Sequence, residues 1–324
     1  MLDALLENKL VAAVGFAIAV PLVLIGYILL IEAILRRTPR RWAAGLRPWL
    51  WLAPGLTFLG VFLVYPTIAT IVRSLQNRRG NDFIGLDNYA WFFSQEDTLV
   101  ALRNNAIWVV LLPALVVGLG LLVAVLVDRV RYESVVKSIV FLPLAISFVA
   151  ASVIWRFMYE LDPNIGTLNA VATAAGSDPV FWLNGQPWNN LFLIIVGVWL
   201  LTGFAMVILS AGLKGISTEL LEAARVDGAN EVQVFRRIVL PLLAPTIAVV
   251  ATTVVIYALK TFDVVYTMTN GNFGTDVIAN LMYSQLFAGG QPGRAAAIAV
   301  VLLFAIIPVM YINIQRFRQQ EAIR

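Results

Sequence analysis

The chain has 324 residues, of which 60% are hydrophobic and 13% are charged, and its mean hydropathy is +0.85. This balance is far more apolar than that of soluble globular domains, so the composition predicts an all-α, polytopic membrane protein. The formal charge of +4 does not indicate nucleic-acid binding, because the basic residues stand beside apolar runs, and the absence of cysteine and histidine excludes disulfides, thiol or imidazole catalysis and the common zinc sites.

The first apolar run covers residues 10–31, which is long enough to cross a bilayer core that needs about 20 residues. A cleaved signal peptide is a poorer interpretation, because Asp3 and Glu7 precede the run and the run is too long. A basic segment follows directly and carries five arginines: Arg36, Arg37, Arg40, Arg41 and Arg47. By the positive-inside rule this segment is cytoplasmic, and the N-terminus is therefore expected outside.

The second expected span covers residues 49–72 and contains Pro54 and Pro66, which can kink a membrane helix without interrupting it. It leads into an external segment, residues 76–105. Four arginines on this side oppose the positive-inside bias: Arg73, Arg78, Arg79 and Arg103. Residues 106–127 then return inward and residues 138–155 lead out again. The next external loop covers residues 159–190, with Trp182 and Trp188 as expected interface anchors.

After a span at residues 191–213 comes the longest polar break in the second half of the chain, residues 214–240, here named the coupling loop. The sequence predicts a helix capped by Ser217 or Thr218, a break at Asp227-Gly228, and a second helix. Asn230 and Gln233 have the spacing of a capping box at the start of this second helix. A polar helix–turn–helix between two spans is expected to meet a partner outside the lipid.

Residues 238–259 form the next expected span, and a turn is predicted at residues 269–272. Residues 276–287 are too few to span and predict a half-buried external helix, before residues 295–315 cross for the last time. The count is seven spans. Of the 23 basic residues, 15 fall in the four segments expected in the cytoplasm, and the last of these holds Arg316, Arg318 and Arg324, so the C-terminus is expected inside.

The coupling loop resembles that of the permease subunits of ATP-binding-cassette (ABC) importers, whose pattern is E-A-A, three residues, G, nine residues, I-x-L-P. The resemblance implies that the loop forms coupling helices that contact a separate ATPase. The residues that it implicates are Glu222, Ala223, Ala224, Asp227, Gly228, Ala229, Phe235, Ile238, Leu240 and Pro241. Such permeases have a six-span core, so residues 1–47 are expected to be an extra transmembrane helix with a basic cytoplasmic linker, and residues 48–324 the permease domain.

Three further segments are similar to carbohydrate importer permeases of the maltose and α-glucoside type: residues 202–210, 227–230 and 269–271. The pattern F-x-G-L-x-N-Y, at residues 83–89, also resembles an element of sugar permeases, although a plain interfacial loop with aromatic anchors would look alike. The resemblance implies a bacterial inner-membrane subunit that imports an α-glucoside or another di- or oligosaccharide by alternating access. The implied partners are two ATPase subunits, a second permease subunit and an extracytoplasmic sugar-binding protein.

The sequence contains no G-x-x-x-x-G-K-[ST] phosphate-binding loop, so ATP and Mg are expected on the partner ATPase, with no cofactor in this chain. An enzyme is not indicated, because no cluster of carboxylates or serines stands inside a span. Import of another small polar solute, such as glycerol phosphate, stays an alternative. An ion-coupled secondary transporter is a weaker one, because buried acidic residues and an inverted repeat are not visible.

A substrate path is expected to use aromatic and polar side chains that lipid-facing helices would not keep. Aromatic faces beside hydrogen-bonding groups suit sugars, although the same residues could pack between helices or bond to their own backbone. Lys260 and Asp263, three residues apart, are expected to pair at the interface. The candidates for the path are Trp199, Thr202, Gly203, Tyr257, Thr261, Asp263, Asn280 and Tyr283.

Overall fold

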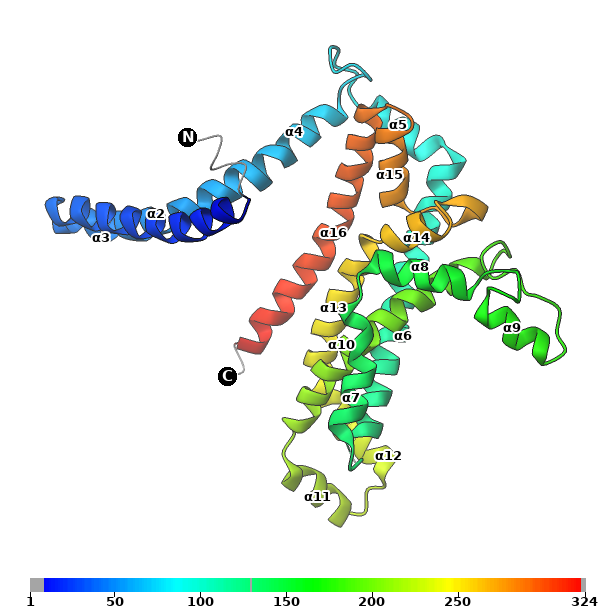
Figure 1. The fold of residues 1–324 in the computed structure, drawn as a ribbon. Coiled ribbons are helices and arrows are strands. Elements are labelled where there is room, and N and C mark those ends of the chain that lie inside the picture. The colour runs from blue at the N-terminus through cyan, green and yellow to red at the C-terminus, as the bar shows by residue number, and fades with distance from the viewer. Residues whose placement is uncertain (1–8, 129, 322–324) are drawn as a thin grey trace. The chain divides into compact units, whose positions relative to one another are not determined.

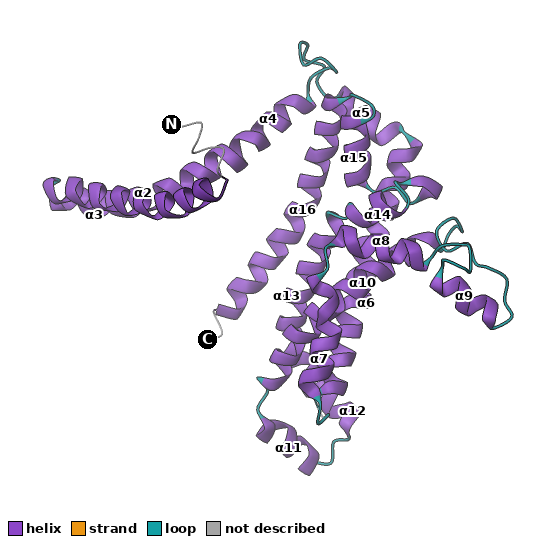
Figure 2. Ribbon diagram, viewed as in Figure 1, coloured by secondary structure: helices purple, strands orange, loops and turns teal. Residues whose placement is uncertain are grey.

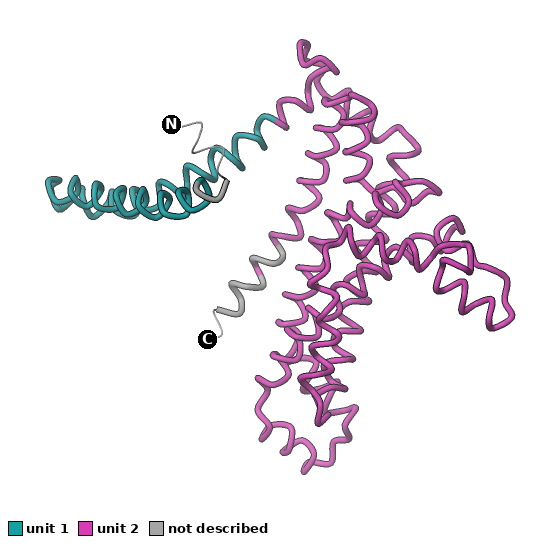
Figure 3. Tube along the Cα trace, in the orientation of Figure 1, with its two compact units in different colours: residues 1–69 teal, residues 70–324 magenta. Residues whose placement is uncertain are grey.

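The computed structural model describes residues 9–128 and 130–321, and the regular elements in that part of the chain are helices (Figure 2). The predicted positions of the two chain ends, including Arg324, lie outside the described residues. Clustering of contacts divides the chain into two compact units, Met1–Ala69 and Thr70–Arg324 (Figure 3). This division does not coincide with the boundary expected after residue 47, which stays a prediction.

In the first unit, helix α2 (Lys9–Arg37) packs against helix α3 (Arg40–Leu59). Only Thr38 and Pro39 separate them, so most of the basic segment that was expected to be a linker is helical. The reason is that Pro39 has φ −51° at the N-cap of α3, and a proline just before a helix favours its start. Three of the five arginines therefore lie on α3.

Polar contacts join α2 to α3. The Tyr27 hydroxyl donates to the carbonyl oxygen of Leu50 at 2.7 Å. The Glu32 carboxylate accepts hydrogen bonds from Arg47 at 3.0 Å and from the Trp51 indole nitrogen at 3.2 Å. A carboxylate on an apolar helix needs such partners, because an unpaired charge in lipid is costly.

Helix α3 continues through a π-helical turn, η1 (Gly60–Val64), into α4 (Tyr65–Ser74), so that 35 residues form one helical segment. The π-helical turn ends two residues before Pro66, whose ring nitrogen cannot donate to the carbonyl four residues earlier. The prediction that prolines distort this span without interrupting it is confirmed, although the helix begins nine residues before the expected start of the span.

The F-x-G-L-x-N-Y pattern leads into helix α5 (Asp87–Ser94). The buried amide of Asn88 donates to the carbonyl oxygens of Ser74 at 2.8 Å and Gln76 at 3.0 Å. The Tyr89 hydroxyl pairs with the Ser74 hydroxyl at 2.7 Å. The asparagine and tyrosine of this pattern therefore tie the start of α5 to the end of α4.

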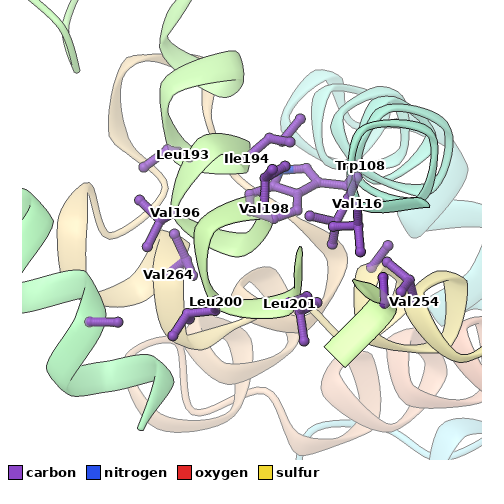
Figure 4. Packing of buried hydrophobic residues seen from close by; sticks show 14 of the residues in the cluster. Trp108, Val116, Leu193, Ile194, Val196, Val198, Leu200, Leu201, Val254 and Val264 are labelled. Atoms are coloured by element: carbon purple, nitrogen blue, oxygen red, sulfur yellow. The ribbon is translucent and has the colours of Figure 1, made fainter. Parts of the chain in front are cut away.

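The core of the second unit is built around α10 (Asn189–Lys214), which packs along α6 (Glu96–Val127) and α13 (Leu240–Leu259) (Figure 1). Figure 4 shows Trp108 of α6 among the side chains of α10, with Val254 of α13 and Val264 of α14 in the same cluster. Because α10 contacts other helices along its whole length, it can be apolar on all faces.

Helix α6 begins ten residues before the expected span, at Glu96. Asn104 and Asn105 fall in the segment expected to be external, residues 76–105, yet both are buried on α6. The Asn104 amide donates to the carbonyl oxygens of Gly274 and Asp276, both at 2.8 Å, and the Asn105 side-chain oxygen accepts from the Ile278 backbone at 2.7 Å. Hydrogen bonds to a distant loop permit this burial.

The expected span at residues 138–155 is not one straight helix. It is divided into α7 (Glu133–Phe141), the 3₁₀ turn η2 (Leu142–Ala145) and α8 (Phe148–Met158), and the two parts are bent by 99°. Pro143 lies in the turn, and the Ser147 side chain accepts a hydrogen bond from Ala150 to cap α8. The sequence predicted a span here but not its bend, because hydropathy does not sense a bend.

The described residues contain six helices long and apolar enough to cross a membrane, or seven if the bent pair is one span. The all-α, polytopic class is therefore confirmed. The last spanning helix is α16 (Pro292–Glu321), and the short helix predicted before it is confirmed as α15 (Ile278–Phe287). Three other short elements lie between spans: α9 (Thr167–Ala174), α14 (Asp263–Met268) and η4 (Asn272–Gly274).

Candidate functional site

The coupling loop lies at one end of the second unit, where Figure 1 shows α11 (Thr218–Val226) and α12 (Glu231–Val234). The chain leaves α11 through a complete Schellman motif: Ala229 donates to the Ala224 carbonyl at 3.0 Å and Gly228 donates to the Arg225 carbonyl at 3.1 Å. Gly228 has φ +86°, a left-handed conformation that side chains disfavour. The predicted break at this glycine is confirmed.

The capping box predicted for the second helix is also confirmed. The Asn230 side chain accepts from the Gln233 backbone, and the Gln233 side chain accepts from the Asn230 backbone, both at 2.9 Å. Ser217 occupies the N-cap of α11, but its side chain makes no capping hydrogen bond, unlike the cap that the sequence predicted. Helix α12 continues through a π-helical turn, η3 (Phe235–Val239), directly into α13.

Most coupling residues present their side chains to the surface. Helix α11 has no buried residue, and its exposed side chains include apolar ones, Leu220 at 46% and Val226 at 87% exposure. The implicated residues divide into an exposed set, Glu222, Ala223, Asp227, Gly228, Leu240 and Pro241, and a half-buried set, Ala224, Ala229, Phe235 and Ile238. Exposed apolar side chains on a helix that packs on little else favour a docking surface.

Ion pairs lie at the start of the coupling loop and across its turn. The Glu133 carboxylate at the start of α7 contacts the ammonium groups of Lys137 and Lys214, with Lys214 at 2.6 Å, and Lys137 also contacts the Ser210 hydroxyl. Across the turn, the Arg225 guanidinium donates to Glu231 at 2.7 Å, and this bond raises the pKa of Arg225. The first contacts join α7 to α10, and the Arg225–Glu231 pair joins α11 to α12.

The capping box gives a direct test of how the second coupling helix is held. Substitution of Asn230 by alanine is expected to destabilise α12 by about 1 kcal/mol, because one backbone donor loses its partner. Amide exchange in α12 should then be about fivefold faster. Ser217→Ala is the matched control, because its hydroxyl makes no cap bond, and it should leave exchange in α11 unchanged. Equal effects of the two variants would contradict this role of the cap.

Three of the predicted path residues meet at one cavity of about 470 Å³, here named the aromatic cavity. Tyr257 lies in the last turn of α13, Thr261 lies just beyond the end of that helix, and Asp263 is at the start of α14. The Tyr257 ring stacks on Phe148 of α8, with centroids 6.0 Å apart. The cavity is also lined by residues that sequence reasoning missed: Phe148, Thr253, Ile256, Lys260, Phe262 and Val264.

Only some of these unpredicted lining residues could have been identified from the sequence. Thr253 lies one helical turn before Tyr257 and could have been found by spacing alone. Phe148 comes from a different helix, and only the fold brings it there. Lys260 and Asp263 both line the cavity, but no ion pair joins them in the described part of the chain, so the expected pairing was wrong.

The other path candidates lie elsewhere in the second unit. The Trp199 ring meets Trp155 edge to face at 5.8 Å, and the Thr202 hydroxyl donates to the Val198 carbonyl of its own helix. Gly203 lies against the backbone of α7, where an added Cβ would come within 2.6 Å of the Phe141 Cα. Trp199 and Gly203 therefore pack between helices, whereas Thr202 bonds to its own helix.

The two candidates on α15 also have structural partners. The Asn280 amide donates to the Asp276 carboxylate at 2.8 Å, and burial raises the pKa of Asp276. The Tyr283 ring packs at 5.3 Å from Phe262, a residue of the aromatic cavity, and at 5.0 Å from Tyr266. Tyr283 thus supports the wall of the cavity, whereas Asn280, in the first turn of α15, bonds to the loop that precedes this helix.

The chain is similar to known membrane transport proteins. The profile of the family described as "Binding-protein-dependent transport system inner membrane component" matches residues 116–319. The osmoprotective compounds uptake permease protein GgtC of Synechocystis sp. is 50% identical over 279 residues, which cover 85% of this chain and 100% of that protein. The alpha-glucoside transport system permease protein AglF of Rhizobium meliloti is 46% identical over 286 residues, which cover 87% of this chain and 85% of that protein.

A similar fold is present in a solved transporter. The crystal structure of a bacterial alginate ABC transporter, in complex with an alginate pentasaccharide-bound periplasmic protein, contains a chain that matches with a TM-score of 0.74 at 26% identity. The match covers 85% of this chain and 96% of that chain.

Proposed function

The chain belongs to the family of binding-protein-dependent transport system inner membrane components, and on that premise we propose that it imports a neutral sugar. As a member of the family it is a multi-pass inner-membrane protein and the non-catalytic permease subunit of an ABC importer. The proposed cargo is an α-glucoside or another di- or oligosaccharide. The observation that carries this substrate class is the aromatic cavity.

The lining of the aromatic cavity suits a neutral sugar. Aromatic rings such as Tyr257 and Phe262 can cover the C–H faces of a sugar, while the hydroxyls of Thr253 and Thr261 can bond its hydroxyl groups. One cation and one anion, Lys260 and Asp263, line the cavity, so it has no excess charge to favour an ionic solute. The similarity to an α-glucoside permease supports the same class.

Helix α13 gives the proposed mechanism a physical link. Together with α12 and η3 it forms one helical segment of 29 residues, Glu231–Leu259, which begins in the coupling loop and ends at the aromatic cavity. At 1.5 Å per residue, the segment joins two sites about 44 Å apart. A push on α12 by an ATPase is therefore transmitted along one rod to the side of the cavity that holds Tyr257, which is the coupling that alternating access requires.

The proposed assembly contains two ATPase subunits that bind ATP and Mg, a second permease subunit and an extracytoplasmic sugar-binding protein. In this arrangement the coupling loop, residues 214–240, and the C-terminus face the cytoplasm, and the N-terminus lies outside. Residues 1–47 add one helix to a core formed by residues 48–324. The basic segment that contains Arg36 and Arg47 supports this orientation, because arginines favour the cytoplasmic side.

The substrate class is tested by uptake into cells with and without this chain. The panel contains labelled α-glucosides, other oligosaccharides, glycerol phosphate and a charged uronic-acid oligosaccharide. Uptake of a neutral sugar that depends on the chain supports the proposal. Uptake of glycerol phosphate or of the uronic-acid oligosaccharide alone would overturn it. The similarity to a permease for osmoprotective compounds makes small polar osmoprotectants the second class to include.

The role of the aromatic cavity is tested by Tyr257→Ala. Loss of the ring is expected to weaken sugar binding by about 1 kcal/mol, which would raise the KM of uptake about fivefold with little change in maximal rate. Phe304→Ala is the control, because this exposed aromatic lies on α16 and does not line the cavity. If both variants keep the original KM, the cavity is not on the sugar's path.

A further inference from the structure

A second cavity of about 240 Å³, here named the loop cavity, lies beyond the end of α8. It is near the start of α10, at the opposite end of that 26-residue helix from the coupling loop. The proposed orientation therefore places the loop cavity on the extracytoplasmic side. The lining residues that concern us are Arg156, Glu160, Phe181, Trp182, Asn184 and Phe273.

One buried side chain holds two walls of the loop cavity together. Asn169 of α9 is fully buried, and its amide nitrogen donates to the Glu160 carbonyl at 2.9 Å and the Val180 carbonyl at 3.1 Å. Its side-chain oxygen accepts from the Val180 backbone at 2.8 Å. The chain segments before and after α9 are thus fixed at a set spacing, and a preformed cavity binds a ligand with little ordering cost.

The third wall is fixed from α10 and the preceding loop. Both Gln186 and Asn189 donate side-chain hydrogen bonds to the Phe273 carbonyl oxygen at 2.8 Å. Phe273 has φ +59°, which is an uncommon, strained conformation for a residue other than glycine. Strain of this kind persists only where the surroundings enforce it, and here it places an aromatic ring at the cavity.

The chemistry of the lining matches a neutral, hydroxyl-rich molecule. Arg156 supplies donors and Glu160 supplies acceptors, and their charges balance. The volume is below the range of about 300–1,000 Å³ for pockets of larger ligands. The loop cavity therefore suits one sugar ring, whereas the aromatic cavity has room for more than one ring.

The two cavities are aligned along the same pair of helices. Helices α8 and α14 pack together, and Phe148 and Asp263 near their starts line the aromatic cavity. Arg156 and Met268, near their ends, line the loop cavity. Eight residues of α8 separate Phe148 from Arg156, which corresponds to about 12 Å along the helix. This separation is short enough for successive rings of one oligosaccharide to occupy both cavities.

We propose that the loop cavity is a second binding site, which holds one ring of a neutral polyhydroxylated solute before the solute reaches the aromatic cavity. The inference rests on the proposed import of a neutral sugar. A site in the loop cavity would select solutes by charge before they reach the aromatic cavity. The opposite charges of Arg156 and Glu160 balance, so neither an anionic nor a cationic ring binds there with an advantage.

The chain has no cysteine, so a single introduced thiol reports on the cavity without competing thiols in this subunit. Asn184→Cys places a thiol at the loop cavity, and Ser177→Cys places one on the same external loop outside it. Each variant is assembled into the complete transporter in lipid nanodiscs, without binding protein, and modified with a neutral methanethiosulfonate. The probe is the neutral sugar whose uptake depends on the chain, and the readout is the modification rate of this subunit.

At a sugar concentration of about four times Kd, modification of Asn184→Cys should slow about fivefold, because the free fraction of the site falls as 1/(1 + [L]/Kd). Ser177→Cys should react at an unchanged rate. Adding Arg156→Gln to Asn184→Cys should remove the protection, and a uronic acid at the same concentration should protect less than the neutral sugar.

The outcomes separate this inference from the proposed function. If a neutral sugar is imported but does not protect Asn184→Cys, or protects Ser177→Cys equally, the loop cavity is not a sugar site. A second series adds sugar-free binding protein; if this protein protects Asn184→Cys and sugar alone does not, the surface is a protein contact and the proposal is overturned. If uptake experiments find no neutral sugar, the proposed function fails, and this inference, which rests on it, is overturned with it.

Discussion

Gly228→Asp is expected to reduce sugar-stimulated ATP hydrolysis and uptake by at least about tenfold, which is a loss of about 1.4 kcal/mol of coupling. The substitution places a negative side chain on the exposed turn between α11 and α12, where the proposed ATPase contact lies. Aspartate is among the residues that tolerate φ near +86°, so the subunit should still fold and assemble. The measurement is ATP hydrolysis by the reconstituted transporter with sugar-loaded binding protein.

A second glycine in the chain, Gly176, supplies a matched control for the backbone strain that Gly228→Asp introduces. Gly176 follows α9, has φ +83°, and ends its helix with the same pair of Schellman hydrogen bonds, from Ser177 to Ala172 and from Gly176 to Thr173. Neither glycine has a neighbouring heavy atom within 4 Å of an added Cβ. Gly176→Asp should therefore carry the same backbone strain and leave ATP hydrolysis coupled. Full sugar-stimulated hydrolysis by Gly228→Asp would argue against a coupling role for the loop.

Gly203→Ala is expected to destabilise the subunit by about 1–3 kcal/mol and to lower its Tm in detergent by about 2–10 °C. The added Cβ would overlap the Val140 carbonyl oxygen and lie 2.6 Å from the Phe141 Cα. Both atoms belong to the backbone at the bend after α7, so the contact cannot be relieved by a side-chain rotation. Gly203→Val should be worse, because valine adds two methyl groups at the same place.

Gly118→Ala is the control for this prediction. Gly118 lies inside α6, and an added Cβ there would meet no heavy atom within 4 Å, so Tm should be unchanged or slightly higher. The pair of variants also decides between two roles for Gly203. A residue on the substrate path would raise the KM of uptake at normal Tm, whereas a packing residue lowers Tm. A normal Tm for Gly203→Ala would contradict the close approach of α10 to the bend.

The features that the sequence predicted best depend on neighbours within a few residues. The apolar run at residues 191–213 became α10 with ends within two residues of the expectation, because lipid and core both exclude charges. The turn at Gly228 and the capping box at Asn230 were predicted from local hydrogen-bonding chemistry and are present. The same is true of α15, whose length alone showed that it could not span.

The failures occurred where a distant segment decides the outcome. The early start of α6 depends on Asn104, whose amide bonds to a loop 170 residues later in the chain. The bend between α7 and α8 lies within one apolar run. The hydropathy of such a run is the same whether its helix is straight or broken. Thr202 and Gly203 had the residue types of a substrate path, yet one bonds to its own helix and the other packs on a neighbour.

The sequence by itself determined the membrane class, the spans and the chemistry of the coupling loop, since each follows from hydropathy, charge bias or capping over a short stretch. Only the tertiary structure decided which side chains share a cavity. Phe148, Tyr257 and Asp263 come from three different helices, and only the packing of α8, α13 and α14 brings them together. The physical reason is that local signals specify whether a segment is helical, whereas side-chain packing over long sequence distances specifies which helix faces meet.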